Sequence, residues 1–158
     1  MKRYDVELGA GVGPVLLGMT REEARGAMGE EPVCFSKTGT DRHETDAFHE
    51  NGFQIFYEGD HPRVEFIELS GGCNFEVFYG DKNVFATPAK DLVSLISRVA
   101  PLDESHQEVG YMFIFPDLEL SLWRPVKPES EDDPEGKYFM TIGVGVEGYF
   151  SNATNRIP

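Results

Sequence analysis

The chain of 158 residues is 40% hydrophobic and 12% aromatic, and its 28 acidic and 14 basic residues give a net charge of -14. This apolar content can offset the conformational entropy lost on folding, which excludes a disordered chain, and the length fits a single domain over residues 1–158. The excess of acid repels phosphates and anionic lipids, so we expect no nucleic-acid and no membrane partner and favour a basic protein. The alternative is that the acid serves solubility alone.

No apolar run approaches the roughly 18 residues that are needed to span a bilayer. Residues 1–8 alternate charged and apolar side chains, whereas a signal peptide has a continuous apolar stretch. A cytoplasmic location is therefore expected. Cys34 and Cys73 lack CxxC spacing, and two cysteines make no disulfide framework in a chain without an export signal, so we expect two free thiols.

Two helices are predicted. The first begins after Thr20, because Thr20 and Glu23 have the spacing of a capping box, and it ends at Gly29. The second begins with Pro88 at its first position and ends at Pro101. Its apolar side chains recur with helical spacing at Leu92, Leu95, Ile96 and Val99. This wide apolar face is expected to lie across a sheet.

Most of the remaining chain predicts strands, because aromatic and β-branched residues are concentrated between turn formers. The strand candidates are residues 53–57, 63–69, 75–79, 111–115, 118–123 and 137–146, with weaker ones at 4–8 and 33–37. Short connections at 58–62 and 115–117 predict antiparallel hairpins. Residues 38–50 are predicted to form a polar loop, residues 127–136 an acidic loop, and residues 151–158 a flexible C-terminal tail.

These elements predict an α+β fold, with a mainly antiparallel β-sheet and two short-to-medium helices packed on one face. Each helix is followed by a meander of strands, which suggests two similar β-α-β(n) halves and an internal duplication. Aligning Thr20 with Thr87, however, leaves the apolar stripes of the two helices one position out of step.

Few motifs of enzyme chemistry are present. The glycine run at residues 9–13 lacks the Lys-Ser/Thr and the βαβ context of a phosphate-binding loop, and no nucleophile motif surrounds either cysteine. A candidate metal site is the group Asp41, His43, Asp46 and His49, which mixes imidazole and carboxylate ligands that suit Zn or Mn. The other interpretation is a solvated loop, and no cofactor is expected.

A candidate binding surface follows from the alternation within the strands. One side of several strands is apolar, and the other alternates acidic or amide residues with aromatic ones. If helices cover one face only, the second side becomes an exposed surface suited to a partner; otherwise loops or a helix cover it. The residues assigned to this surface are Phe56, Glu76, Phe78, Glu119 and Trp123, together with Glu131, Asp132 and Asp133 of the acidic loop.

Residues 11–24 read GVGPVLLGMTREEA, a strand that ends in Leu-Gly-Met-Thr and runs into a capped helix. This opening resembles those of small bacterial α+β proteins with a GxGPxxLGMTxEE segment, of β-lactamase-inhibitory-protein-like domains and of outer-membrane assembly lipoproteins. The chain lacks the lipobox cysteine of the lipoproteins and the paired cysteines of the inhibitors. In size and acidity it is similar to immunity proteins, which neutralise basic toxins.

Three functions are therefore considered. The leading one is a non-catalytic protein-binding module of the immunity or inhibitor type, which docks a basic partner through its acidic and aromatic surface. The second is a small metal-dependent or small-molecule-acting enzyme that uses the loop of His43 and His49. The third is a structural homo-oligomer that hides the aromatic face against a second copy.

Overall fold

Two α-helices and mostly antiparallel sheets make up the part of the chain that the structure, a computed structural model, describes: residues 1–39, 42–105 and 110–150. The predicted α+β class is confirmed. The helices are α1 (Arg21–Met28), α2 (Ala89–Ser97) and the short 3-10 helix η1 (Pro116–Leu118). No helix in this described part is long and apolar enough to cross a membrane.

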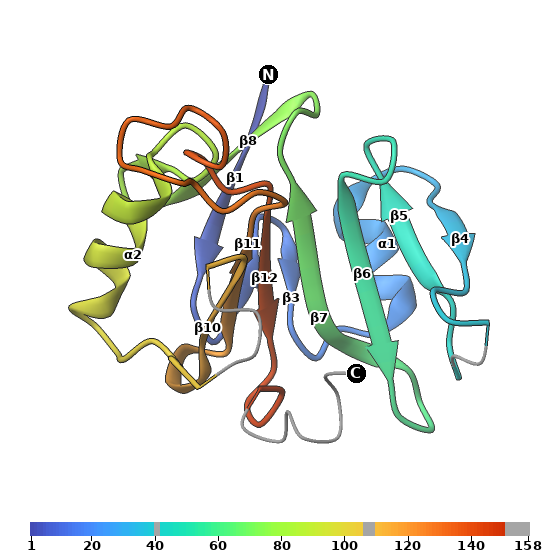
Figure 1. Ribbon diagram of the computed structural model, residues 1–158. Coiled ribbons are helices and arrows are strands. Elements are labelled where there is room, and N and C mark those ends of the chain that lie inside the picture. The colour runs from blue at the N-terminus through green and yellow to red at the C-terminus, as the bar shows by residue number, and fades with distance from the viewer. Residues whose placement is uncertain (40–41, 106–109, 151–158) are drawn as a thin grey trace.

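The strands form a five-stranded and a seven-stranded sheet (Figure 1). The smaller sheet has the order β3-β2-β1-β8-β9 and contains β1 (Lys2–Glu7), β2 (Gly11–Val12), β3 (Val15–Leu16), β8 (Phe75–Tyr79) and β9 (Lys82–Asn83). The larger has the order β10-β11-β12-β7-β6-β5-β4 and contains β4 (Val33–Phe35), β5 (Thr45–Phe48), β6 (Phe53–Glu58), β7 (Arg63–Ser70), β10 (Met112–Phe115), β11 (Leu120–Trp123) and β12 (Thr141–Gly145).

Strand pairing follows the two predicted hairpins. β6 pairs with β7 across residues 59–62, and β10 pairs with β11 across η1, in both cases antiparallel. β1 and β8 pair in parallel, whereas the other pairings of named strands are antiparallel. Strands β4 to β7 follow α1, and strands β10 to β12 follow α2. Both groups of strands belong to the larger sheet, where they meet at the β7–β12 pair. A common origin of the two halves remains a prediction.

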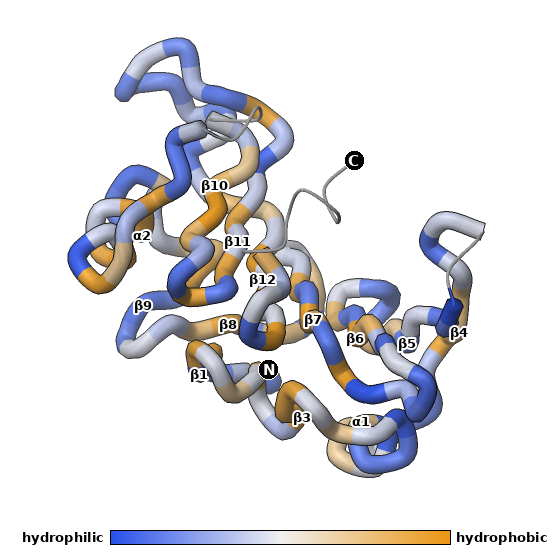
Figure 2. Tube along the Cα trace, turned by 90° about the horizontal axis from the view of Figure 1, so that it is seen from below, coloured by the Kyte–Doolittle hydropathy of each residue, from blue (hydrophilic) through white to orange (hydrophobic). Residues whose placement is uncertain are grey.

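One core lies between the two sheets and the helices. Figure 2 shows the five-stranded sheet on one side of the row of strands from β10 to β4. Ala24 and Met28 of α1 and Leu92 and Ile96 of α2 are buried in the same cluster as the inward side chains of the larger sheet, such as Ile67. Both helices therefore pack on one face of that sheet, as predicted. The opposite face is called the outer face below.

Helix α1 begins and ends as the sequence predicts. The Thr20 hydroxyl accepts a hydrogen bond from the Glu23 amide at 3.2 Å, and a Glu23 carboxylate oxygen accepts one from the Thr20 amide at 3.1 Å. Gly29 terminates the helix with a left-handed φ of 72°. Such a conformation suits a residue without Cβ.

The predicted end of helix α2 and the predicted loop at 38–50 were wrong. α2 ends at Ser97 and not at Pro101. Residues 45–48 form the buried strand β5, although the sequence predicted a loop over 38–50. The strands β2, β3 and β9, each of two residues, were also not predicted. The predicted tail at 151–158 lies outside the described residues.

Candidate partner-binding surface

The predicted acidic and aromatic surface is divided between the two sheets. Glu76 and Phe78 lie on β8 of the five-stranded sheet. The Glu76 carboxylate accepts a hydrogen bond from the Asn83 side chain at 3.0 Å, and the Arg3 guanidinium lies 3.8 Å from the centre of the Phe78 ring. Both side chains are therefore engaged within their own sheet, and they form no continuous face with the residues of the larger sheet.

Phe56, on β6, belongs to an apolar cluster on the outer face. Its ring centre lies 5.8 Å from that of Phe66. The Lys37 ammonium lies over the Phe56 ring, 4.7 Å from its centre. Tyr149 stacks on Phe66 at 4.5 Å. This second cluster, separate from the core, consists of Phe66, Ile114 and Phe150, with Phe56, Met112 and Tyr149 packed against them.

Glu119 has a local structural task. It follows η1 with a left-handed φ of 51°, and its carboxylate accepts a hydrogen bond from the Phe150 amide at 2.9 Å. This bond holds Phe150 on the outer face. The predicted role of Glu119 in contacting a partner therefore competes with a contact inside the chain.

Trp123 lies half-buried at the end of β11, beside several exposed apolar side chains. The Met140 amide donates to the Trp123 carbonyl at 2.7 Å, and the Arg124 amide donates to the Tyr111 carbonyl at 3.0 Å, so the three segments lie side by side. The exposed fractions are 42% for Tyr111, 37% for Val126, 43% for Tyr138 and 43% for Met140. We call Tyr111, Trp123, Val126, Tyr138 and Met140 the apolar patch.

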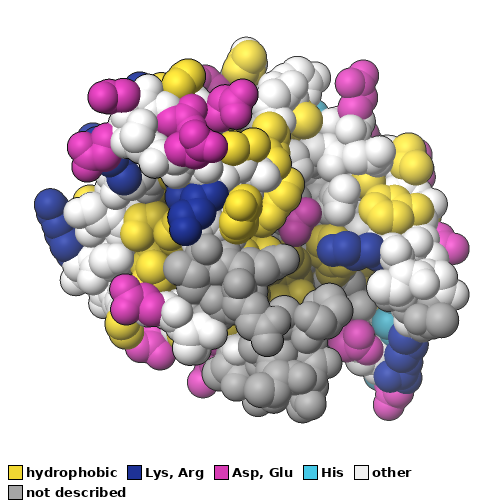
Figure 3. Space-filling view, viewed as in Figure 1, with side chains coloured by type: hydrophobic (Ala, Val, Ile, Leu, Met, Phe, Trp, Pro, Cys, Tyr) yellow, Lys and Arg dark blue, Asp and Glu magenta, His cyan; other side chains and the backbone are white. Residues whose placement is uncertain are grey.

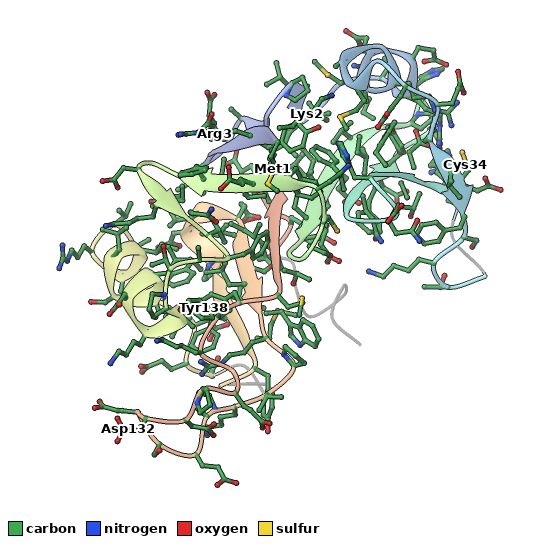
Figure 4. The ribbon with its side chains drawn as sticks, turned by 90° about the horizontal axis from the view of Figure 1, so that it is seen from above. Met1, Lys2, Arg3, Cys34, Asp132 and Tyr138 are labelled. Carbon is green, nitrogen blue, oxygen red and sulfur yellow. The ribbon has the colours of Figure 1, made fainter. Side chains whose placement is uncertain are left out.

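The acidic loop, residues 127–136, leaves the sheet from this patch. Glu131 and Asp132 are exposed, and Figure 4 shows Asp132 where the loop projects far from the sheets. The Asp133 carboxylate accepts hydrogen bonds from the amides of Glu129 (3.1 Å) and Glu135 (2.9 Å). These bonds lower the pKa of Asp133 and fix the shape of the loop. No acid of the loop forms an ion pair with another residue in the described ranges.

Arg124 anchors the base of the loop. Its Nε donates to the Gly110 carbonyl at 2.7 Å and its Nη1 to the Gly136 carbonyl at 2.9 Å. The guanidinium also lies near the rings of Phe113 and Phe139, at 5.2 and 6.0 Å from their centres. Burial lowers the pKa of Arg124, which nevertheless stays protonated because an arginine starts so far above neutral pH. The acidic loop is thus joined to the sheet by a fixed cation.

Figure 3 shows the result on the surface: acidic side chains gather beside apolar ones over the ends of β11 and β12. Trp123 thus lies near the base of the acidic loop, whose projecting part carries Glu131, Asp132 and Asp133, and the other predicted binding residues lie on other strands. Sequence reasoning missed Tyr111, Tyr138 and Met140. The predicted strands 111–115 and 137–146 included these residues, whereas β10 and β12 begin only at Met112 and Thr141, so the three side chains escape the alternation that buries their neighbours.

Asp46, one of the predicted metal ligands, is fully buried on β5 and belongs to an ion-pair cluster. Arg25 donates to both of its oxygens at 2.8 Å, Arg21 donates at 3.0 Å, the Tyr57 hydroxyl at 2.8 Å and the Cys34 thiol at 3.3 Å. Burial raises the pKa of Asp46, but the hydrogen bonds from Arg25, Tyr57 and Cys34 outweigh it and hold the pKa below its usual value. This carboxylate is not available to a metal.

The two histidines of the predicted metal site form hydrogen bonds with different parts of the chain. His43 Nε2 donates to the Gly59 carbonyl at 2.6 Å. His49 Nδ1 lies 3.0 Å from Asn74 Oδ1, which can only accept, so its Nε2 accepts from the Tyr4 hydroxyl at 2.7 Å when the ring is neutral. Asp41 lies outside the described residues, and among those described no group of three or more His, Cys, Asp or Glu could hold a metal.

No family model matches the chain, and neither a curated protein nor a solved structure matches it.

Proposed function

We propose that this protein is a binding module that docks a basic protein through the acidic loop and the adjoining apolar patch. One observation carries the proposal: exposed Tyr111, Tyr138 and Met140 lie at the base of a loop that bears five acidic residues and one lysine. Tyrosine, tryptophan and methionine are enriched where protein interfaces are buried, the rim around them is polar, and charges near an interface are complementary to those of the partner. The combination supports a partner with apolar and basic surface side by side.

The two parts of this site have different tasks. Unpaired carboxylates on a projecting loop attract a basic partner over a distance and raise its association rate. The apolar patch then loses contact with water, which slows dissociation. A basic toxin or enzyme, held by an immunity or inhibitor protein, is the kind of partner that fits both tasks.

The test uses peptides selected from a random library on the immobilised full chain. Selected peptides are expected to be rich in arginine or lysine, with an aromatic or aliphatic residue nearby. Their association rate should fall at least about tenfold between about 0.01 M and about 0.5 M salt, since the screening length shrinks from about 30 Å to a few ångströms. Selected peptides without cationic residues, or rates that do not depend on salt, would refute the proposal.

A matched pair of variants locates the site. Glu129→Gln, Glu131→Gln, Asp132→Asn and Glu135→Gln together remove the loop's charge but keep Asp133, which shapes it. The control removes the same charge from exposed acids elsewhere, by changing Glu7, Glu22, Glu30 and Glu31 to Gln. Only the loop variant should lose the association rate. Equal losses in both would show that net charge, and not the loop, attracts the peptides.

The apolar patch is tested with the double variant Tyr138→Ser, Met140→Ser. It should bind the selected peptides about tenfold more weakly, mainly through faster dissociation. The same variant separates partner binding from self-association, because sedimentation reports the mass of the chain. A wild-type dimer that this variant converts to a monomer would assign the patch to a second copy of the chain and contradict the proposal.

A further inference from the structure

Glu68 is a carboxylate in the middle of the outer face that has no hydrogen-bonding partner in the described part of the chain. It lies on β7, where its neighbours across the ladder are Gln54 of β6 and Gly143 of β12. The Gln54 amide donates to the Asn51 carbonyl at 3.0 Å and not to Glu68, and Gly143 has no side chain to offer. Among the described residues, none donates a hydrogen bond to Glu68 or forms an ion pair with it.

The surroundings of Glu68 are poorly solvating. The side chain is half-buried, and Phe66, two residues before it on the same strand, lies on the same face of the sheet. Burial raises the pKa of Glu68, and the charge of Lys37 opposes this only in part. Lys37 is directed at the Phe56 ring, 4.7 Å from its centre. Glu68 is thus partly desolvated, its carboxylate oxygens remain accessible to water, and it has no ion-pair partner among the described residues.

A partly buried carboxylate without a partner is less stable in its charged form than one in water, and it gains from a hydrogen-bonding cation. Its counterpart on the core side, Asp46, shows that this chain can pair a carboxylate fully when it serves the fold. A site that awaits a ligand has the opposite design, since its free acceptor gains hydrogen bonds only on binding. The rings of Phe56 and Phe66 add faces on which a cation can lie.

Resting on the function proposed above, we propose that Glu68 is the anchor for an arginine or lysine side chain of the basic partner. A single partner can reach both regions of the surface. Trp123 pairs with Thr141, and Thr141 with Ser70, so Trp123 and Glu68 are separated by two strand spacings and two residues along the strand. With standard sheet dimensions this separation is roughly 12 Å. The acidic loop attracts the partner, and Glu68 fixes its position.

The test is a double-mutant cycle between the full chain and a selected arginine-containing peptide. On the protein, Glu68→Gln keeps the shape and removes the charge; on the peptide, each arginine is replaced in turn by citrulline, which is neutral and of nearly equal shape. Glu68→Gln should weaken the peptide about tenfold or more, and one citrulline peptide should be insensitive to it. Glu7→Gln, the same change on an exposed strand of the other sheet, is the control and should leave the affinity unchanged.

The outcomes separate this proposal from the one on which it rests. Peptides that need the loop's charges but bind equally to Glu68→Gln would overturn the anchor alone. Peptides that ignore the loop's charges yet couple to Glu68 would overturn the role of the loop alone. Coupling of Glu68 in thermal unfolding with Arg156 of this chain, in place of the peptide's arginine, would assign the site to the chain's own C-terminal segment and overturn the anchor as well. Unfolding curves of Glu68→Gln also check that lost binding does not come from lost structure.

Discussion

Two carboxylates on the seven-stranded sheet show how one chain treats acids in opposite ways. Asp46 on β5 is fully buried on the core side and receives hydrogen bonds from two arginines, a tyrosine and a thiol. Glu68 on β7 is half-buried on the outer face and receives none from a described residue. The first arrangement joins α1, β4, β5 and β6, and the second leaves an acceptor open toward the surface. The difference distinguishes acids that hold the fold from acids that can serve binding.

The largest effect should come from breaking the Asp46 cluster. Asp46→Asn removes the charge that Arg21 and Arg25 share, and the loss of one partner from a buried ion pair costs about 3 kcal/mol. Urea unfolding measures this difference. Asp5→Asn is the control, because the Arg3–Asp5 pair is exposed and should contribute less than about 0.5 kcal/mol. Similar losses in the two variants would show that the cluster is not a structural centre.

The outer face should be sensitive to added volume at Gly143. A methyl group there would clash with the Phe66 ring and lie 2.7 Å from the Ser121 hydroxyl oxygen. Phe66 has little room to move, because Tyr149 stacks on it. Gly143→Ala should therefore cost about 2 kcal/mol of unfolding free energy. Adding Phe66→Leu should recover part of that loss, and strictly additive costs would mean that the clash is not with Phe66.

Much of the fold could be predicted from the sequence because its signals are local. The capping box of Thr20 and Glu23 and the hairpin turn at 59–62 depend on neighbouring residues only. The strand β5 could not be predicted in this way. Its sequence, Thr-Asp-Ala-Phe, contains a charged residue in a polar stretch, and the burial of Asp46 becomes favourable only when Arg21 and Arg25 arrive from α1. Tertiary pairing here overrode local propensity.

The candidate site was predictable only in part, for a related reason. The composition of residues 127–136 indicated an acidic loop, and Trp123 was recognised from its strand. Alternation cannot tell which sheet a strand joins, so Glu76 and Phe78 were assigned to a face that the fold divides. Nor does alternation show which acids find partners. Asp46 lay in a predicted loop and Glu68 in a predicted strand, and only their neighbours in space show that the first is paired and the second is not.

The smallest effect is a pH dependence of opposite sign at the two acids. The folded-state pKa of Asp46 is lowered from its usual 3.8, so its contribution is present above that pH and is lost as the pH falls through the folded value. The folded-state pKa of Glu68 is raised from its usual 4.5, so the native state binds more protons than the unfolded state just above that pH. Ionisation of Glu68 therefore lowers stability as the pH rises, and Glu68→Gln, which cannot ionise, should escape this loss.

Denaturant unfolding between about pH 4 and pH 7 tests this prediction. As the pH rises above the usual glutamate pKa, the unfolding free energy of the variant should increase relative to that of the wild type by less than about 1 kcal/mol. Glu7→Gln is the control for the removal of one exposed negative charge. A wild type that instead gains on Glu68→Gln with rising pH would mean that the carboxylate is already paired in the folded chain, and Glu68 would then belong with Asp46 among the acids that hold the fold.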